Sequence, residues 1–215
     1  KAFANPILTN LKHEDSNKEI ILKLSEEILS KFTKLELLDK YDVYQVLLAY
    51  WNETMNDDVL LVIQDELGYK LAKVTDDIKE EPKESKKSKK DSAKEKKPKE
   101  PKVIGWEGRL IPKQIVLDAF FEAEQKAIEE AEEKLNQTES ELEEFVEENT
   151  EDDELSQEPE ILKKCKAYEA SIKSQKKTIA DLKKKLDENC RNRYDTFTDT
   201  EITDLLVNRK WYKTI

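Results

Sequence analysis

The chain has 215 residues, of which 40% are charged and 37% hydrophobic, and its formal net charge at pH 7 is −11. These totals predict one or two small domains and argue against one large core. Three glycines are too few for a turn-rich β fold or a glycine-rich phosphate loop, and no run of 18 apolar residues could span a membrane. So acidic a chain disfavours nucleic-acid binding over its whole surface, while local lysine clusters stay open as contacts.

Residues 1–78 are predicted to form a helical head. A helix begins near Asn17, a suitable N-cap, because apolar residues recur after it at steps of three and four. A second helix begins near Leu37 and ends at the polar run 56–58. The β-branched run 59–63 is either a strand or the opening of a short helix.

Residues 79–102 differ from the rest of the chain in composition. They are mostly Lys, Glu, Ser and Pro, and Ala93 is their only aliphatic residue. Such a segment cannot bury enough apolar surface to offset the entropy lost on ordering, so we expect a disordered linker. A lysine-rich arm that touches nucleic acid is the functional alternative, although the interspersed glutamates dilute its field.

Residues 103–114 are predicted to form an apolar base segment that packs on the head, with a strand that pairs with 59–63. Pro112 suits the first turn of the helix that follows. Residues 191–215 form a C-terminal segment that returns to the head, with a short helix opening at Asp199. Aromatic and aliphatic residues from these pieces form the predicted head core: Tyr44, Leu48, Trp51, Trp106 and Trp211.

Residues 115–190 carry two heptad patterns that meet at an acidic loop, 147–160. Alternating steps of four and three average 3.5 residues, so each pattern forms one narrow stripe on a helix. Because a single stripe needs a partner and the loop is short, we predict an antiparallel coiled-coil hairpin. Its seam is predicted to contain Leu117, Phe121, Ile128, Leu135, Leu142, Ile161, Cys165, Tyr168, Ile172, Ile179, Leu182 and Leu186.

The charges of the two arms favour this pairing, because the first arm is acidic outside its stripe and the second is basic. Exposed pairs contribute only about 0.2–1 kcal/mol each, so they select the partner and direction more than they create stability. Four stripe positions are polar: Glu124, Thr138, Gln175 and Asn189. They either set the register of a solvated coiled coil or belong to a seam that another protein partly uses.

The sequence holds no pattern typical of a catalytic or metal site. It has one histidine, His13, no cysteine pair with zinc spacing, and none of the common nucleotide-binding or nucleophile motifs. Cys165 and Cys190 would lie too far apart on one helix to form a disulfide, and unpaired cysteines fit the reducing cytoplasm, where we expect the protein.

The predicted fold is therefore mainly α: a small helical head, a minor two-stranded β element and a long antiparallel coiled-coil hairpin. Composition and pattern favour a role in binding or scaffolding, either toward a different protein or by self-association through the arms.

Three groups of residues resemble a known family. They are LDKYDVYQ at 38–45 with YWNETMNDD at 50–58, GWEGRLIPK at 105–113, and FFEAEQ at 120–125. In this order they are similar to the C-terminal part of the modification (methyltransferase) subunit of type I restriction–modification systems. The closing EITDLLVNRKW at 201–211 is similar to the stretch after that family's long helices, and the resemblance covers most of the chain from about Leu37 onward.

The resemblance implies a parent enzyme that transfers a methyl group from S-adenosylmethionine to N6 of adenine in DNA. Its catalytic domain would lie before Lys1, because Asn5-Pro6 is followed by Ile7 rather than by a second proline and an aromatic residue. We therefore assign no catalytic, cofactor-binding or metal residue to this chain. The implied role is docking on the DNA-specificity subunit, and through it joining a second modification subunit on DNA, with no membrane contact.

Overall fold

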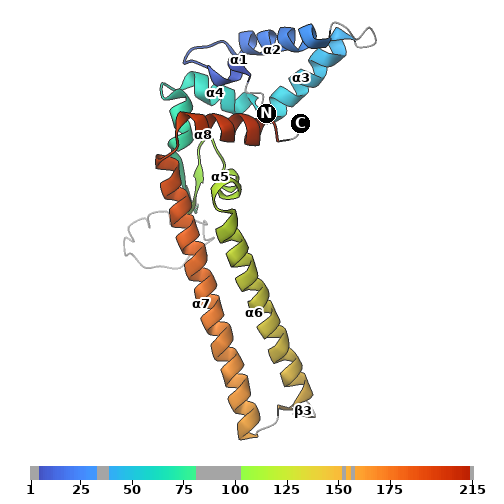
Figure 1. The fold of residues 1–215 in the computed structure, drawn as a ribbon, viewed down its shortest axis with the longest axis vertical. Helices are drawn as coiled ribbons and strands as arrows, with labels where there is room; N and C mark the ends of the chain where they lie inside the picture. Colours follow the sequence, from blue (N-terminus) through green and yellow to red (C-terminus); the bar gives the residue numbers. More distant parts are fainter. Residues whose placement is uncertain (1–4, 33–38, 81–102, 152–153, 156–157, 214–215) are drawn as a thin grey trace, which may run out of the picture. The chain divides into compact units, whose positions relative to one another are not determined.

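The computed structural model describes residues 5–32, 39–80, 103–151, 154–155 and 158–213. They are mainly helical, with a small antiparallel two-stranded sheet, as the sequence predicted (Figure 1). The chain divides into two compact units: unit 1, formed by Lys1–Ile115 and Tyr194–Ile215, and unit 2, formed by Val116–Arg193. The predicted linker lies outside the described residues from 81 to 102.

Five helical segments begin unit 1: α1 (Pro6–Thr9), α2 (Asn17–Phe32), α3 (Lys40–Thr54), α4 (Asn56–Gln64) and the 3₁₀ turn η1 (Gly68–Lys73). Asp39 caps α3, because its side chain accepts a hydrogen bond from the backbone N–H of Tyr41. The chain leaves the helical conformation at Met55, and α4 starts one residue later.

Strands β1 (Thr75–Lys79) and β2 (Val103–Gly108) pair antiparallel, with Thr75 opposite Gly108. The predicted pairing of the base segment with 59–63 is therefore wrong, because that run lies in α4. Val59, Val62 and Ile63 are buried at helical spacing, so tertiary burial outweighs the strand preference of their side chains.

An exposed bidentate ion pair joins Arg109, the residue after β2, to Asp76 in β1. The guanidinium of Arg109 donates from Nε to Asp76 Oδ2 at 2.8 Å and from Nη2 to Asp76 Oδ1 at 2.5 Å. These hydrogen bonds lower the pKa of the Asp76 carboxyl. The pair joins the two strands just beyond the last pair of their register.

The C-terminal segment of unit 1 contains α8 (Asp199–Thr203) and the π-helical segment η2 (Asp204–Trp211). A capping box opens α8: the Thr198 hydroxyl accepts from the N–H of Glu201, and the Glu201 carboxylate accepts from the N–H of Thr198. Most apolar side chains of this segment are buried: Ile202, Leu205, Leu206, Val207 and Trp211.

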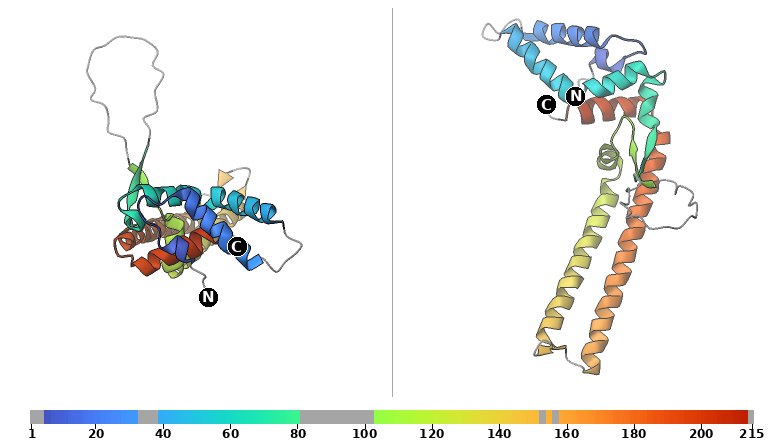
Figure 2. Two further views of the ribbon diagram at one scale, coloured as in Figure 1. Left: turned by 90° about the horizontal axis from the view of Figure 1, so that it is seen from above. Right: turned by 180° about the vertical axis from the view of Figure 1, so that it is seen from behind.

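Unit 2 contains most of α5 (Lys113–Phe120), α6 (Glu122–Glu148) and most of α7 (Pro159–Asp195) (Figures 1 and 2). The predicted first arm is not one continuous helix, because Phe121 separates α5 from α6 with φ −128° and ψ 26°. Within the predicted acidic loop, α6 runs on to Glu148 and two short strands, β3 (Thr150–Glu151) and β4 (Glu154–Leu155), pair antiparallel.

Gly108 lies where a side chain has no room. An added Cβ would meet the carbonyl oxygen of Ile111 at 2.1 Å and the ring of Tyr194 at 2.5 Å. The Tyr194 hydroxyl donates to that same carbonyl at 2.7 Å, and its ring packs edge-on against Trp106 with centroids 5.6 Å apart. The glycine therefore permits the close approach of β2, the Ile111 carbonyl and Tyr194.

We predict that Gly108→Ala lowers the free energy of unfolding by about 2 kcal/mol or more, because the backbone must shift to admit the methyl group. Thermal unfolding followed by circular dichroism measures the change. Gly105→Ala is the matched control, because an added Cβ there meets nothing within 4 Å. Equal melting temperatures for the two variants would contradict the close packing at Gly108.

Candidate functional site: the helix pair of unit 2

Helices α6 and α7 lie side by side and run in opposite directions (Figures 1 and 2). Two ion pairs bridge them at corresponding positions. Glu132 pairs with Lys183 at 2.5 Å, and Glu139 pairs with Lys176 at 2.7 Å. Seven residues separate the two glutamates, and seven residues separate the two lysines. The register between the helices is therefore the same at both pairs.

A second pair of contacts repeats this spacing inside the seam. Gln175 Nε2 donates to Thr138 Oγ1 at 3.1 Å, and the rings of Phe145 and Tyr168 lie 6.1 Å apart. Again seven residues separate the two contacts on each helix. Two of the predicted polar stripe positions, Thr138 and Gln175, thus bond to each other across the seam. Gln175 Oε1 is buried and has no hydrogen-bond partner among the described residues.

The predicted seam residues fall into two classes of burial. Ile128, Cys165 and Ile179 are buried, with 7–8% of their surface exposed. Nine others are half-buried: Leu117, Phe121, Leu135, Leu142, Ile161, Tyr168, Ile172, Leu182 and Leu186. Leu117 belongs to α5 and Phe121 to the break before α6, so they do not share a continuous helix with the rest of their stripe.

The predicted head-core residues belong to unit 1, and its tryptophans are more deeply buried than most of the seam. Trp51 and Trp211 are 0% exposed and Trp106 is 6% exposed, whereas Tyr44 and Leu48 are half-buried. The two units therefore differ in how fully they bury their apolar side chains. Unit 1 encloses its tryptophans, whereas most seam residues of unit 2 remain partly in contact with solvent.

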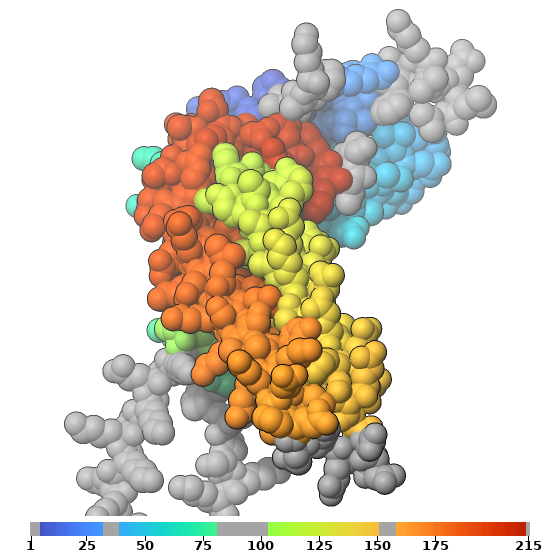
Figure 3. Space-filling view, turned by 60° about the horizontal axis from the view of Figure 1, so that its bottom comes forward, coloured from blue at the N-terminus to red at the C-terminus, as the bar shows by residue number. Residues whose placement is uncertain are grey.

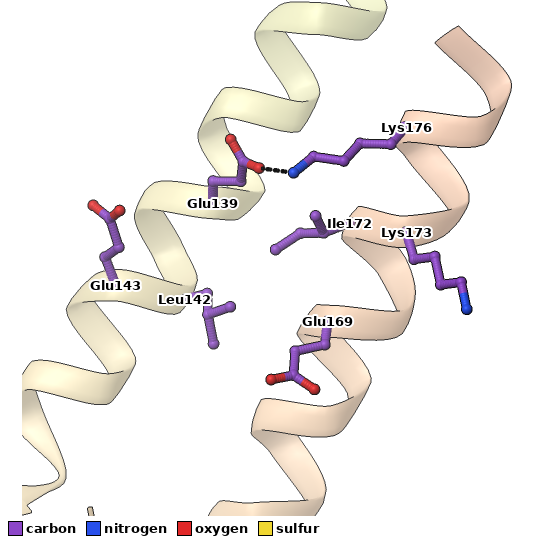
Figure 4. Close-up of a pocket in the computed structure, with 7 residues that line it drawn as sticks. All are labelled: Glu139, Leu142, Glu143, Glu169, Ile172, Lys173 and Lys176. Atoms are coloured by element: carbon purple, nitrogen blue, oxygen red, sulfur yellow. Dashed lines mark ion pairs between the residues drawn. The ribbon is translucent and has the colours of Figure 1, made fainter. Parts of the chain in front are cut away.

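An open groove of about 620 Å³ follows the seam in the half of the helix pair nearer to β3 and β4. Figure 4 shows Leu142 and Ile172 projecting between the helices, with Lys176 reaching across to Glu139. Glu143 and Glu169 also line this groove. Where their atoms are visible in the space-filling view, the side chains of α6 and α7 meet along the pair (Figure 3). The groove thus combines a half-buried apolar floor with charged walls.

In unit 1, the segment 50–58 holds the C-terminal pair Lys210-Trp211. Trp211 Nε1 donates to Asp58 Oδ2 at 2.8 Å, and Lys210 Nζ lies 2.7 Å from the same oxygen. Lys210 also donates to the carbonyl of Leu110 at 2.7 Å, and the Tyr50 hydroxyl donates to the carbonyl of Trp211. One polar network therefore joins three of the segments that carry the family resemblance.

The charged residues of the segment 105–113 also have local partners. Glu107 Oε1 accepts a hydrogen bond from the backbone N–H of Lys113, and the Lys113 ammonium lies 4.7 Å from the centre of the Trp106 ring. Together with the Arg109–Asp76 pair, these contacts give the aromatic and charged side chains of this segment a structural role.

Sequence reasoning missed Asp58, Lys210 and Tyr194 as structural residues. It took 56–58 as the end of a helix, whereas the run forms the first turn of α4. One signal was present, because an acidic residue in the first turn of a strongly apolar helix is well placed for a partly buried partner. Nothing in the sequence identifies Lys210 as that partner, since 152 residues separate the two.

The remaining candidates for chemistry are His13 in unit 1 and two cysteines in unit 2. His13 Nε2 lies 3.9 Å from a carboxylate oxygen of Glu14, and both side chains are largely exposed. Cys165 and Cys190 are both buried and lie on α7. Among the described residues, no group of three or more His, Cys, Asp or Glu side chains could hold a metal ion. In the same part of the chain, every helix is too short or too polar to cross a membrane.

Comparison of the chain with protein-family models, curated proteins and solved structures finds no match. The geometry defines two kinds of structural unit. One unit is a helical core closed by a polar network, and the other is an antiparallel helix pair whose seam is partly open.

We predict that Asp58→Ala costs about 2–3 kcal/mol of stability, because it leaves the Lys210 ammonium and the buried Trp211 indole N–H without their carboxylate. Thermal unfolding of the full chain measures the loss. Asp57→Ala removes the same charge from the exposed neighbouring position and should have an effect within about 0.5 kcal/mol. Similar losses in both variants would show that the charge, rather than the network, matters.

Proposed function

We propose that this chain is the non-catalytic C-terminal region of the modification subunit of a type I restriction–modification system. Its helix pair docks on helices of the DNA-specificity subunit and so assembles an N6-adenine methyltransferase with a second modification subunit. In this arrangement the specificity subunit reads the DNA site. S-adenosylmethionine and the catalytic residues belong to another part of the parent protein.

The observation that carries this proposal is the half-buried seam of α6 and α7. Seven of the predicted seam residues on these two helices remain partly exposed, and the groove at Leu142 and Ile172 has an apolar floor. Burying residual apolar surface contributes about 25 cal/mol per Å², so a third or fourth helix laid along this seam would gain stability from it. Docking of an apolar helix face into such a groove is a common mode of protein recognition.

The structural use of the resembling segments also supports the proposal. Segments 50–58, 105–113 and 201–211 meet through Asp58, Leu110 and Lys210-Trp211. Members of a family that share a fold would bring these three segments together through contacts of this kind. A set of interlocking segments is what a shared fold requires.

The test is co-purification of the 215-residue chain with a specificity subunit of a type I system. Leu142→Asn with Ile172→Asn should weaken the complex at least tenfold, a loss of about 1.4 kcal/mol, because both changes place polar groups in the groove. Isothermal titration calorimetry measures the affinity. Circular dichroism must show that both helices persist.

The matched control is Ser140→Asn with Ala170→Asn, because both positions are exposed and lie outside the groove. If the groove variant loses helix, Glu143→Lys with Glu169→Lys provides a second probe that leaves the apolar residues intact. Absence of binding by the unmodified chain at micromolar concentration would refute the proposed partner.

A second candidate is self-association through the same arms. It is favoured by the opposite charges of α6 and α7, since a twofold axis would set the acidic helix of one copy against the basic helix of the other. Sedimentation analysis separates the candidates, because a monomer at every protein concentration removes this one.

A further inference from the structure

The outer face of α7 carries a straight row of lysines. At 100° per residue, Lys166, Lys173, Lys177 and Lys184 lie within about 20° of one line along the helix. The seam residues of α7 lie on average about 150° away from that line. The row therefore faces away from α6 and differs from the lysines that bridge the two helices.

The side chains bear out this division. In Figure 4, Lys176 reaches toward Glu139 on α6, whereas the ammonium of Lys173 extends away from α6, although the side chain of Lys173 also lines the groove. All four lysines of the row are exposed. Lys184 lies 3.9 Å from Glu188 on the same helix, and within the described part of the chain the other three have no ion-pair partner. Most of the charge of this row is left to solvent.

The chemistry of the row favours one kind of partner. Between Lys166 and Lys184, the only apolar residues within about 40° of the line of the row are Ala170 and Ala180. Protein interfaces are depleted in lysine and depend on buried apolar or aromatic anchors. Membrane-surface helices likewise need an apolar face. A phosphate backbone needs only correctly spaced cations, and small residues between them permit close approach.

The dimensions indicate an extended anion rather than a single phosphate. From Lys166 to Lys184 the row spans about 27 Å, with intervals of about 10, 6 and 10 Å at 1.5 Å per residue. A compact anion could touch no more than two of these ammonium groups. Duplex DNA is a stiff polyanion that presents phosphates of its two strands over a length greater than that of the row.

The acidic arm does not cancel this attraction at physiological salt. The exposed glutamates of α6, such as Glu133 and Glu144, lie on the opposite side of the helix pair. Two packed helices set these outer faces about 20 Å apart, while the Debye length at 0.1 M salt is about 10 Å. Screening therefore weakens the repulsion from α6 more than the direct contact with lysine.

We propose that Lys166, Lys173, Lys177 and Lys184 on the outer face of α7 form a sequence-independent contact surface for the phosphate backbone of duplex DNA. The inference depends on the charges and spacing of α7, and it holds whether or not the seam binds a specificity subunit.

Fluorescence anisotropy of the full chain with a 30-base-pair duplex, titrated between 50 and 200 mM salt, tests the proposal. Four phosphate contacts predict a slope of log K against log salt near −3.6, at about −0.9 per contact. Lys173→Gln with Lys177→Gln should reduce the magnitude of the slope by about 1.8 and weaken binding at 50 mM salt at least tenfold. Glu188→Gln should strengthen binding, because it frees Lys184.

The matched control is Lys164→Gln with Lys185→Gln, which removes the same charge from α7 outside the row. It should leave the slope within about 0.5 of the unmodified chain. Equal losses in the two double variants would overturn the proposal, since binding would then follow net charge or another segment. Absence of DNA binding at 50 mM salt would overturn it too. So would equally tight binding of polyglutamate, which would indicate an acidic protein as the partner.

Discussion

Two α-helices cannot enclose the apolar stripe between them, and this geometric constraint determines the character of unit 2. Each helix covers its partner from one side only, so most seam side chains keep part of their surface in water even where the contacts are good. Ion pairs and the Thr138–Gln175 hydrogen bond fix the register, but they add little apolar burial. The pair is well specified and still incomplete as a hydrophobic core.

Unit 1 buries its large apolar side chains more fully than unit 2. Chain segments distant in sequence surround its large aromatic side chains, and Trp51 and Trp211 are fully buried. The Trp211 indole donates to Asp58 and the Tyr194 hydroxyl donates to the Ile111 carbonyl, whereas the buried Trp51 Nε1 has no hydrogen-bond partner among the described residues. Unit 1 thus encloses its largest apolar side chains, whereas most seam side chains of unit 2 stay partly exposed. This difference is why the proposed partner-binding role falls to α6 and α7.

Periodicity predicted the elements whose signal is local. The heptads of 115–190 predicted helix over that range, and the structure places most of α5, all of α6 and most of α7 there. It did not reveal the break at Phe121, since that residue occupies a stripe position and only its backbone angles depart from the helix. The β-branched run 59–63 left strand and helix open, and long-range packing decided for α4.

The network around Asp58 could not be derived in the same way. Its members come from three segments, and each is a common residue type whose partner is fixed only by the fold. Gly108 is similar, because its need for a bare backbone arises partly from Tyr194 far along the chain and partly from the backbone path that brings the Ile111 carbonyl close. The lysine row on α7, by contrast, can be derived from the sequence, because it depends only on the helical spacing of four lysines. The sequence alone, however, does not show which of the lysine-rich faces of α7 points away from α6.

The matched seven-residue spacing on both arms limits how the length of this helix pair can change during evolution. Inserting one residue into α6 would rotate every later side chain by about 100° and carry Glu139 and Phe145 away from Lys176 and Tyr168. A whole heptad added to both arms would preserve every pairing. Homologous arms should therefore differ in length by paired multiples of seven residues, about 10.5 Å at a time.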